Sequence, residues 1–350
     1  MDTLVLIIAV TIVFIALFFD FSNGFHDSSN LVATMISSGA LSPKGAVITA
    51  ATFEFIGAYF LGTAVAKTIG KGLIETSLIT ISVVFAALLA AIVWNLFTWY
   101  FGMPSSSSHA LIGGILGAVL IASGVEAIHW PTVETVILML AITPITGLMA
   151  GFLFTKAIFT LFPNVMPTRV NRIFRRLQIL SSIGLALSHG TNDAQKAMGA
   201  ITMSLIILYQ MSPETIEYFY RPSPEGEFIV PKWVIFACST AIALGIASGG
   251  WRIIKTLGMK LYRIRPVHGF SAQSSSGSVI YLAALFGFPV STTQVISSSV
   301  MGAGSAQRIN AVRWGVVSEI LLTWITTIPA AGVLGIVIYL AIKFLVDKLV

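Results

Sequence analysis

The sequence contains few charged residues. Asp, Glu, Lys and Arg make up 10% of its 350 residues, whereas hydrophobic residues make up 56%. A water-soluble domain of this size needs a much more highly charged surface, so this composition excludes a soluble protein. The apolar runs are about 20 residues long, unlike the roughly ten-residue alternating strands of an outer-membrane barrel. We therefore expect an all-α integral membrane protein.

The scarcity of cysteine and the absence of a phosphate loop exclude two further classes of function. Cys238 is the single cysteine, which excludes an intramolecular disulfide and a cysteine-rich metal site. The chain lacks the phosphate loop G-x-x-x-x-G-K-[ST], so ATP-driven transport within this chain is not expected. The first apolar run, from Leu4, has no basic segment before it and no small-residue cleavage site, so we expect a retained helix.

Apolar segments divide the chain into two halves. We expect about ten transmembrane segments: a first repeat over 1–162, a short basic cytoplasmic connector over 163–177, and a second repeat over 178–350. The segments are 3–37, 45–66, 77–101, 106–123, 132–161, 178–209, 232–254, 268–287, 291–304 and 313–346.

Four features recur in both halves in the same order, which indicates a duplication. The matches are 24–27 with 190–193, 67–70 with 255–258, 102–109 with 287–294, and Glu134, Pro144 and Gly147 with Glu319, Pro329 and Gly332. An odd number of crossings in each half makes the second copy enter from the opposite side, which predicts an inverted-topology repeat.

The distribution of Lys and Arg predicts the orientation. With the N-terminus outside, the inside loops hold Lys44, Arg169, Arg172, Arg175, Arg176, Lys255, Lys260, Arg263, Arg265, Arg308 and Arg313. The outside loops and tail hold Lys67, Lys71, Arg221, Lys232, Lys343 and Lys348. Because positive residues favour the cytoplasmic side, we expect a cell-membrane protein with both termini extracellular and the connector inside.

Some segments do not fit a simple span. Residues 3–37 would form a helix of roughly 50 Å, beyond a hydrocarbon core of about 30 Å. We expect broken helices, interrupted near Asn23-Gly24 and again near Gly190, where irregular backbone can line a wet cavity. Segments 77–123 and 268–304 are each expected to form a hairpin, re-entrant in preference to fully spanning. If these hairpins are re-entrant their tips can meet; if they span fully, the tips lie at opposite surfaces.

The hairpin tips are candidates for an anion site. Pro104 and Pro289 each end one helix, and hydroxyl side chains open the next. A helix N-terminus offers free N–H groups and partial positive charge, which suits a phosphate-like oxyanion. The alternative is that these residues only cap their helices. The predicted phosphate-binding residues are Ser105, Ser106, Ser107, Ser108, Ser291, Thr292, Thr293 and Gln294.

Buried carboxylates and amides are candidates for a cation site. Asp27 and Asp193 would repel phosphate, but a hard cation between them and the anion would offset that repulsion. The alternative is a purely structural aspartate that bonds a helix end. Glu54 has no acidic counterpart and is a candidate cation ligand, proton acceptor or gate. The predicted cation-binding residues are Asn23, Asp27, Asn30, Glu54, Asn192 and Asp193.

Other polar residues admit more than one interpretation. Lys196 is either a partner of Asp193 three residues earlier or a positive charge for the anion site. The spacing of His26, His109 and His189 fits no zinc signature, so a transition metal is not expected.

At this point the chain resembles the inorganic phosphate transporter (PiT) family of sodium- or proton-coupled symporters. Residues 190–193 match its repeated Gly-x-Asn-Asp phrase directly, and 24–27 match with His26 in place of Asn. The resemblance implies a secondary active symporter of inorganic phosphate, with Asp27, Asp193 and Glu54 serving the coupling cation. It also implies alternating access around a midplane site and a homodimer.

The expected partners are phosphate, sodium ions in preference to protons, and the lipid bilayer, with no nucleic acid and no cofactor. The rival interpretations are a symporter of another oxyanion such as sulfate, a passive channel, and an intramembrane metal hydrolase that uses the three histidines with both aspartates.

Overall fold

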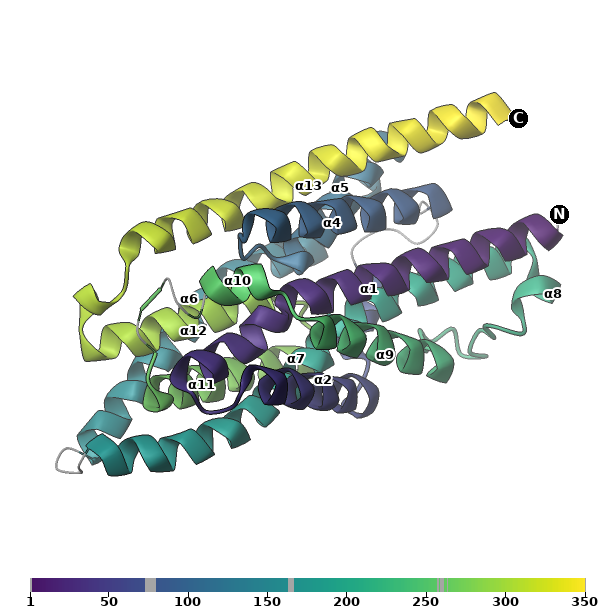
Figure 1. The fold of residues 1–350 in the computed structure, drawn as a ribbon. Coiled ribbons are helices and arrows are strands. Elements are labelled where there is room, and N and C mark those ends of the chain that lie inside the picture. Colours follow the sequence, from purple (N-terminus) through teal and green to yellow (C-terminus); the bar gives the residue numbers. More distant parts are fainter. Residues whose placement is uncertain are drawn as a thin grey trace.

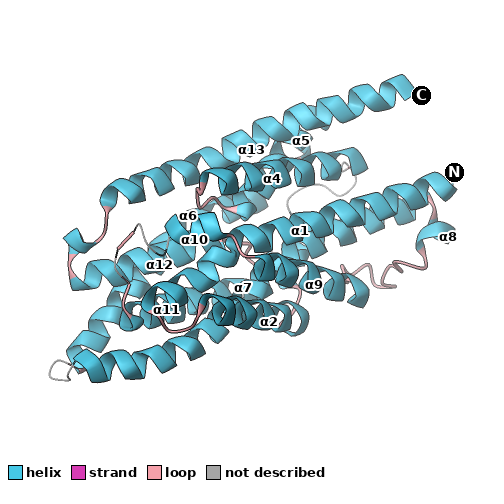
Figure 2. Cartoon of the chain, in the orientation of Figure 1, coloured by secondary structure: helices cyan, strands magenta, loops and turns pink. Residues whose placement is uncertain are grey.

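The computed structural model is a bundle of helices joined by loops (Figure 2). It describes residues 2–72, 80–162, 167–256, 258, 261–262 and 264–349. The α-helices are α1 Asp2–Ser38, α2 Pro43–Phe60, α3 Ala64–Lys67, α4 Ile81–Phe101, α5 Ser107–Ala122, α6 Trp130–Leu161, α7 Pro167–Met211, α8 Pro213–Ile216, α9 Lys232–Ser248, α10 Trp251–Lys255, α11 Pro266–Leu285, α12 Thr292–Gln307 and α13 Trp314–Leu349.

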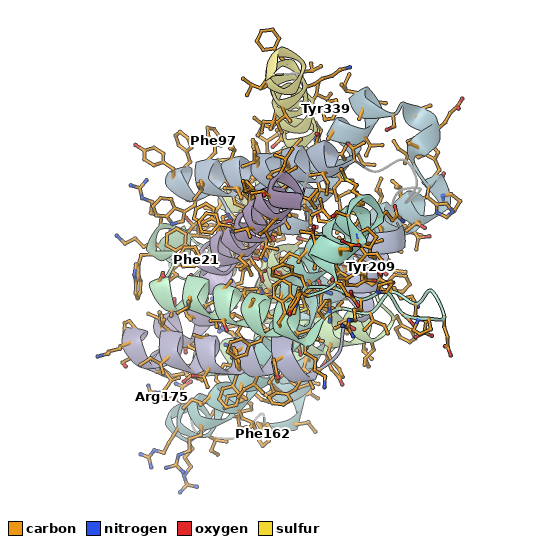
Figure 3. All side chains as sticks on the ribbon, turned by 90° about the vertical axis from the view of Figure 1, so that its right-hand side faces the viewer. Phe21, Phe97, Phe162, Arg175, Tyr209 and Tyr339 are labelled. Atoms are coloured by element: carbon orange, nitrogen blue, oxygen red, sulfur yellow. The ribbon has the colours of Figure 1, made fainter. Side chains whose placement is uncertain are left out.

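Several helices suit a membrane. In the described residues, four are long and apolar enough to cross one: Thr3–Ser38, Ile81–Phe101, Trp130–Leu161 and Trp314–Leu345. A fifth is α2 if it forms one span with Ala64–Gly70, to which it is bent by 64°. Helices α5 and α9 are shorter, with 16 and 17 residues. Figure 3 shows Phe97 pointing away from the bundle, as expected for a lipid-facing side chain.

The predicted breaks near Gly24 and Gly190 are wrong, because α1 and α7 are continuous helices at both positions. Each glycine instead permits a close helix crossing. A Cβ on Gly24 would lie 2.2 Å from the carbonyl oxygen of Ile242, and one on Gly190 would lie 2.4 Å from that of Glu54. The glycines therefore serve packing between helices, a common use of small residues in membranes.

Matched pairs of helices cross between the two halves of the chain. Helix α1 packs on α9 and α2 packs on α7, while α5 packs on α13 and α6 packs on α12. Glycine occurs at these crossings too. A Cβ on Gly117 would lie 2.1 Å from the oxygen of Gly332, and one on Gly302 would lie 2.1 Å from that of Leu148. The halves are thus interlocked rather than set side by side.

The ends of the chain lie together. Figure 1 shows both termini and α8 at one end of the bundle, and the end of α6 and the start of α7 at the other. Helix α7 begins at Pro167, inside the predicted connector, and the four connector arginines are exposed in its first turns. Residues 163–166 of that connector lie outside the described residues, as do Leu257, Lys260 and Arg263.

Candidate functional site

The two hairpin tips meet inside the bundle. The Ser108 hydroxyl donates to the carbonyl oxygen of Val290 at 2.8 Å, which joins the start of α5 to the turn before α12. All eight predicted tip residues are buried. The hairpins therefore bring both helix N-termini to one place, as expected for tips that meet rather than tips at opposite surfaces.

The tip residues divide into caps and inward-facing groups. Ser106 and Ser291 are the N-caps, since their hydroxyls accept from the backbone N–H of His109 at 3.2 Å and of Gln294 at 3.3 Å. Capping thus accounts for one residue of each tip. The remaining ones contact other helices, and Ser107, Thr292 and Thr293 reach α1 or α7.

The carboxylates of Asp27 on α1 and Asp193 on α7 come together. Together with His189 they offer three ligand atoms within 4.8 Å of one another. The Thr292 hydroxyl lies 3.4 Å from Asp27 Oδ2 and 3.3 Å from Asp193 Oδ2, and Thr293 donates to Asp27 Oδ1 at 3.0 Å. Two acidic groups that share hydroxyl neighbours form a ligand set suited to a hard cation.

The neighbouring amides keep oxygen atoms free. Asn23 donates to Asp193 Oδ2 at 3.1 Å and Asn30 donates to Thr293 Oγ1 at 2.9 Å. The buried Oδ1 atom of each amide has no hydrogen-bond partner within the described part of the chain. Buried oxygens without partners are costly unless a ligand satisfies them. Asn192 differs, because its amide donates to Phe288 O and its oxygen accepts from Val290 N, so it holds the second tip.

His189 is a site residue that the predicted cation and phosphate sites left out, because the sequence points to it only as a candidate transition-metal ligand. Its Nδ1 lies 2.8 Å from Glu54 Oε1, and its Nε2 lies 3.8 Å from Asp27 Oδ2 and 3.7 Å from Asp193 Oδ2. Glu54 reaches the centre through this ring. The available signal was the spacing of His189 and Asp193, four residues apart on one helix face.

His26 and Lys196 each contact one carboxylate and one hairpin tip. His26 Nδ1 lies 2.9 Å from Asp27 Oδ1, and its Nε2 lies 3.3 Å from Ser105 Oγ. Lys196 Nζ lies 2.9 Å from Asp193 Oδ1 and 3.1 Å from Ser107 Oγ. Lys196 is therefore both a partner of Asp193 and a positive charge beside a hairpin tip, which are the two interpretations that the sequence allowed.

Asp20 is a buried carboxylate that the predicted cation site did not include. It lies one turn before Asn23 on α1, is fully buried, and has no hydrogen-bond partner on either carboxylate oxygen among the described residues. Its signal in the sequence is a charge within an apolar run.

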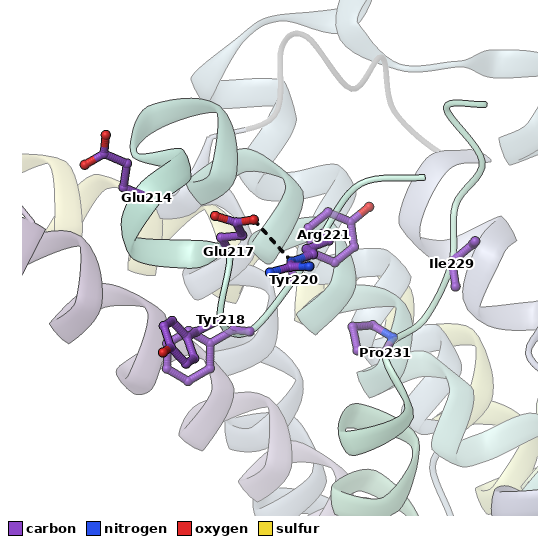
Figure 4. A pocket seen from close by; sticks show the side chains of 8 residues that line it. Glu214, Glu217, Tyr218, Tyr220, Arg221, Ile229 and Pro231 are labelled. Atoms are coloured by element: carbon purple, nitrogen blue, oxygen red, sulfur yellow. Dashed lines mark ion pairs between the residues drawn. The ribbon is translucent and has the colours of Figure 1, made fainter. Parts of the chain in front are cut away.

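A surface cavity of about 530 Å³ lies apart from this centre, at the loop between α8 and α9 (Figure 4). Its walls include Glu214, Glu217 and Arg221, and Arg221 pairs with Glu217 at 3.2 Å, the pair dashed in Figure 4. Acidic walls do not suit an anion, and no predicted site residue lines this cavity.

Comparison with known proteins identifies the family. The model of the phosphate transporter family matches residues 23–167 and 163–335, which includes both phrases and both tips. The chain belongs to this family. Its relatives include proteins named "Probable low-affinity inorganic phosphate transporter". The one from Bacillus subtilis is 43% identical over 349 residues, covering 99% of this chain and 100% of the relative.

Other similarities agree with this assignment. A relative of the same name from Mycobacterium tuberculosis is 45% identical over 343 residues, covering 98% of this chain and 78% of the relative. A solved structure described as "The sodium-dependent phosphate transporter" superposes with a TM-score of 0.84 at 23% identity, covering 96% of this chain and 99% of the other. That likeness shows the fold. This family member is a membrane transporter of phosphate and not an enzyme, which removes the hydrolase interpretation.

Proposed function

We propose that this transporter is a secondary active symporter that couples inorganic phosphate to a cation, sodium in preference to a proton. The observation that carries this proposal is the meeting of Asp27 and Asp193 beneath two joined helix N-termini. Carboxylates attract a cation and N-termini attract an anion, so the centre suits the two solutes together.

The preference for sodium rests on the neutral ligands. Asn23 donates to Asp193, Asn30 donates to Thr293, and both amides keep an Oδ1 atom without a hydrogen-bond partner in the described residues. The hydroxyls of Thr292 and Thr293 contact Asp27. A metal cation needs several oxygen ligands at once, whereas a proton needs one acceptor. The solved structure with this fold is described as sodium-dependent.

The phosphate position rests on the tips. The N-termini of α5 and α12 meet, and the Ser107 hydroxyl of α5 accepts from the buried ammonium of Lys196. Partial charges and hydroxyls hold an oxyanion, and the charge of the Lys196 ammonium is offset by its pairing with Asp193.

Alternating access about this centre follows from an inverted repeat, in which one half rocks against the other. The support is the matched crossing of α1 on α9 and of α7 on α2. The common end of both termini, opposite the basic start of α7, supports the orientation with both termini outside (Figure 1).

Purified protein in proteoliposomes tests the proposal. Labelled phosphate uptake is measured with a sodium gradient imposed at fixed pH, and separately with a pH gradient without sodium. Uptake driven by sodium alone is the expected result, and uptake driven only by the pH gradient would replace sodium by the proton. Excess unlabelled sulfate should not compete; equal competition would favour the other-oxyanion interpretation. Uptake without dependence on either gradient would indicate a passive channel.

A further inference from the structure

The two repeated phrases differ at one informative position. When Asp27 is matched with Asp193, Asn30 is matched with Lys196. Both side chains lie three residues after their carboxylate, so they lie on the same face of α1 or α7 as that carboxylate. One half thus has a neutral amide where the other has an ammonium.

The contacts of this pair are also matched. Asn30, from the first half, donates to Thr293 on the tip of the second half at 2.9 Å. Lys196, from the second half, donates to Ser107 on the tip of the first half at 3.1 Å. Each side chain therefore links the helix that carries its copy of the repeated phrase, α1 or α7, to the hairpin tip of the opposite half.

The two positions differ in what they leave for a ligand. The Oδ1 atom of Asn30 is buried and has no hydrogen-bond partner in the described residues. Lys196 offers no acceptor. It is fully buried, and its ammonium lies 2.9 Å from Asp193 Oδ1. An ammonium therefore lies beside Asp193, whereas the nitrogens beside Asp27 belong to the His26 and His189 rings, at 2.9 and 3.8 Å, and Asn30 keeps a free oxygen one turn further along the same helix.

We propose that Lys196 is a built-in cation, which fills the second of two matched cation positions and leaves only the position at Asp27 and Asn30 for a transported cation. The inference deepens the proposed function and rests on it. Its consequence is a coupling ratio of one cation per phosphate, which becomes two when the ammonium is replaced by an amide.

The simpler role for Lys196 is neutralisation of Asp193 for stability. A buried carboxylate that loses its partner is strongly destabilising, so both roles predict harm when the charge is removed. The roles differ in the coupling ratio, because a stabilising ion pair gives no reason for a second cation to be carried.

The experiment compares the wild type with Lys196→Asn in proteoliposomes held at zero membrane potential. At equilibrium, one extra cation per phosphate multiplies the phosphate accumulation by the cation gradient itself, about tenfold for a tenfold gradient. We expect this increase for Lys196→Asn. An unchanged accumulation ratio in a folded, active variant overturns the proposal, as does a wild-type ratio of two cations.

Two further variants keep the test decisive if Lys196→Asn does not fold. Lys196→Arg keeps the charge and should keep the wild-type ratio. The double exchange Asn30→Lys with Lys196→Asn keeps both side chains and should carry one cation at the Asp193 position, although Asn30→Lys alone should lose cation-dependent uptake. A cation-dependent Asn30→Lys variant would contradict the equivalence of the two positions.

The wild-type measurement separates this inference from the proposed function. Absence of gradient-driven phosphate accumulation in the wild type would refute symport itself. A coupled wild type whose ratio is two, or does not respond to Lys196→Asn, would refute only the built-in cation.

Discussion

Asp27 and Asp193 occupy matched positions but have different partners. Asp27 accepts from Thr293 and lies beside His26, whereas Asp193 pairs with Lys196 and accepts from Asn23. Because their partners differ, we expect the two carboxylates to have different roles, with Asp27 binding the transported cation most directly.

Replacement of either carboxylate should remove coupling. Asp27→Asn loses a ligand of the transported cation, and Asp193→Asn leaves the buried ammonium of Lys196 without its carboxylate partner, so each should abolish sodium-dependent phosphate uptake. The measurement is initial uptake against sodium concentration in proteoliposomes. Glu217→Gln, at a half-exposed surface residue that pairs with Arg221, is the control and should behave as the wild type. Full sodium dependence in either aspartate variant would remove that residue from the cation site.

Glu54 should act through His189. Glu54→Gln replaces a charged hydrogen-bond partner of the ring by a neutral one at the 2.8 Å contact. Hydrogen bonds to charged groups contribute about 1.5–3 kcal/mol, so cation affinity should fall roughly tenfold to hundredfold. Sodium concentration at half-maximal uptake measures this effect. A value equal to that of the wild type, at equal protein yield, would make the Glu54–His189 pair merely structural.

The sequence indicated the carboxylates more readily than their partners. Asp27 and Asp193 stand out because a repeated phrase surrounds them. His189 does not, because its contact with Glu54 depends on how closely α7 crosses α2, and no residue type encodes that distance. The spacing of histidines in the sequence can identify a zinc signature, but it does not predict that a histidine ring will contact a side chain on another helix.

Helix crossings at glycine set the positions of the site residues. Gly190 on α7 packs against the backbone of Glu54 on α2, and Gly57 on α2 packs against Leu187 on α7. The backbone of Glu54 is thus held directly against α7, next to His189. Close backbone approach of this kind is available only to small residues.

A methyl group at this crossing should separate the helices. Gly190→Ala places a Cβ 2.4 Å from Glu54 O, so we expect a loss of stability of about 1–3 kcal/mol, as for overpacked cores, together with weaker cation affinity. Thermal unfolding in detergent and uptake measure the two effects. Gly184→Ala on the same helix is the matched control, because its Cβ meets nothing within 4 Å. Equal melting temperatures for the two variants would contradict a tight crossing.

Short helices tie each hairpin tip to the opposite half. Thr68 donates to the carbonyl oxygen of Gly287 at 2.7 Å, and Thr256 donates to that of Gly102 at 3.0 Å. Both glycines end the first helix of a hairpin with φ near +70°, a conformation that glycine adopts easily. The matched phrases over 67–70 and 255–258 therefore have a common structural use, although Leu257 lies outside the described residues.

Removal of these hydroxyls should loosen the tips. Thr68→Val and Thr256→Val each lose a hydrogen bond with a net contribution of about 0.5–1.5 kcal/mol, so the Michaelis constant for phosphate should rise several-fold. Initial uptake against phosphate concentration checks this result. Thr240→Val, whose hydroxyl bonds within its own helix at an exposed position, is the control. A rise in that control equal to the others would show a general effect of lost hydroxyls.

Helix positions followed from hydropathy, but helix continuity did not. Runs of apolar residues place α4, α5, α11 and α12 close to their predicted ranges, and proline with serine marks both tips. The expected breaks failed because a glycine that permits a close crossing has the same signature in the sequence as one that interrupts a helix. The excess length of α7 instead extends into the arginine-rich segment, where exposed basic side chains indicate a polar environment.

For the whole molecule, the common end of the termini makes orientation testable with single cysteines. Cys238 is the single cysteine, so Cys238→Ala gives a cysteine-free background. Cys238 is also fully buried. Glu225 lies exposed in the loop between α8 and α9, and Arg172 lies exposed near the start of α7. Figure 1 shows α8 at the end of the bundle that holds both termini, and the start of α7 at the opposite end. A reagent that cannot cross the membrane should therefore distinguish these two positions.

We expect Glu225→Cys to react with a membrane-impermeant maleimide in intact cells, and Arg172→Cys to react only after permeabilisation, because arginine-rich segments favour the cytoplasmic side. The parent with Cys238 alone should remain unlabelled, which sets the background. The reverse pattern would place both termini inside the cell. Labelling of both positions in intact cells would contradict opposite sides for the two segments, and an inverted repeat with five crossings in each half requires those opposite sides.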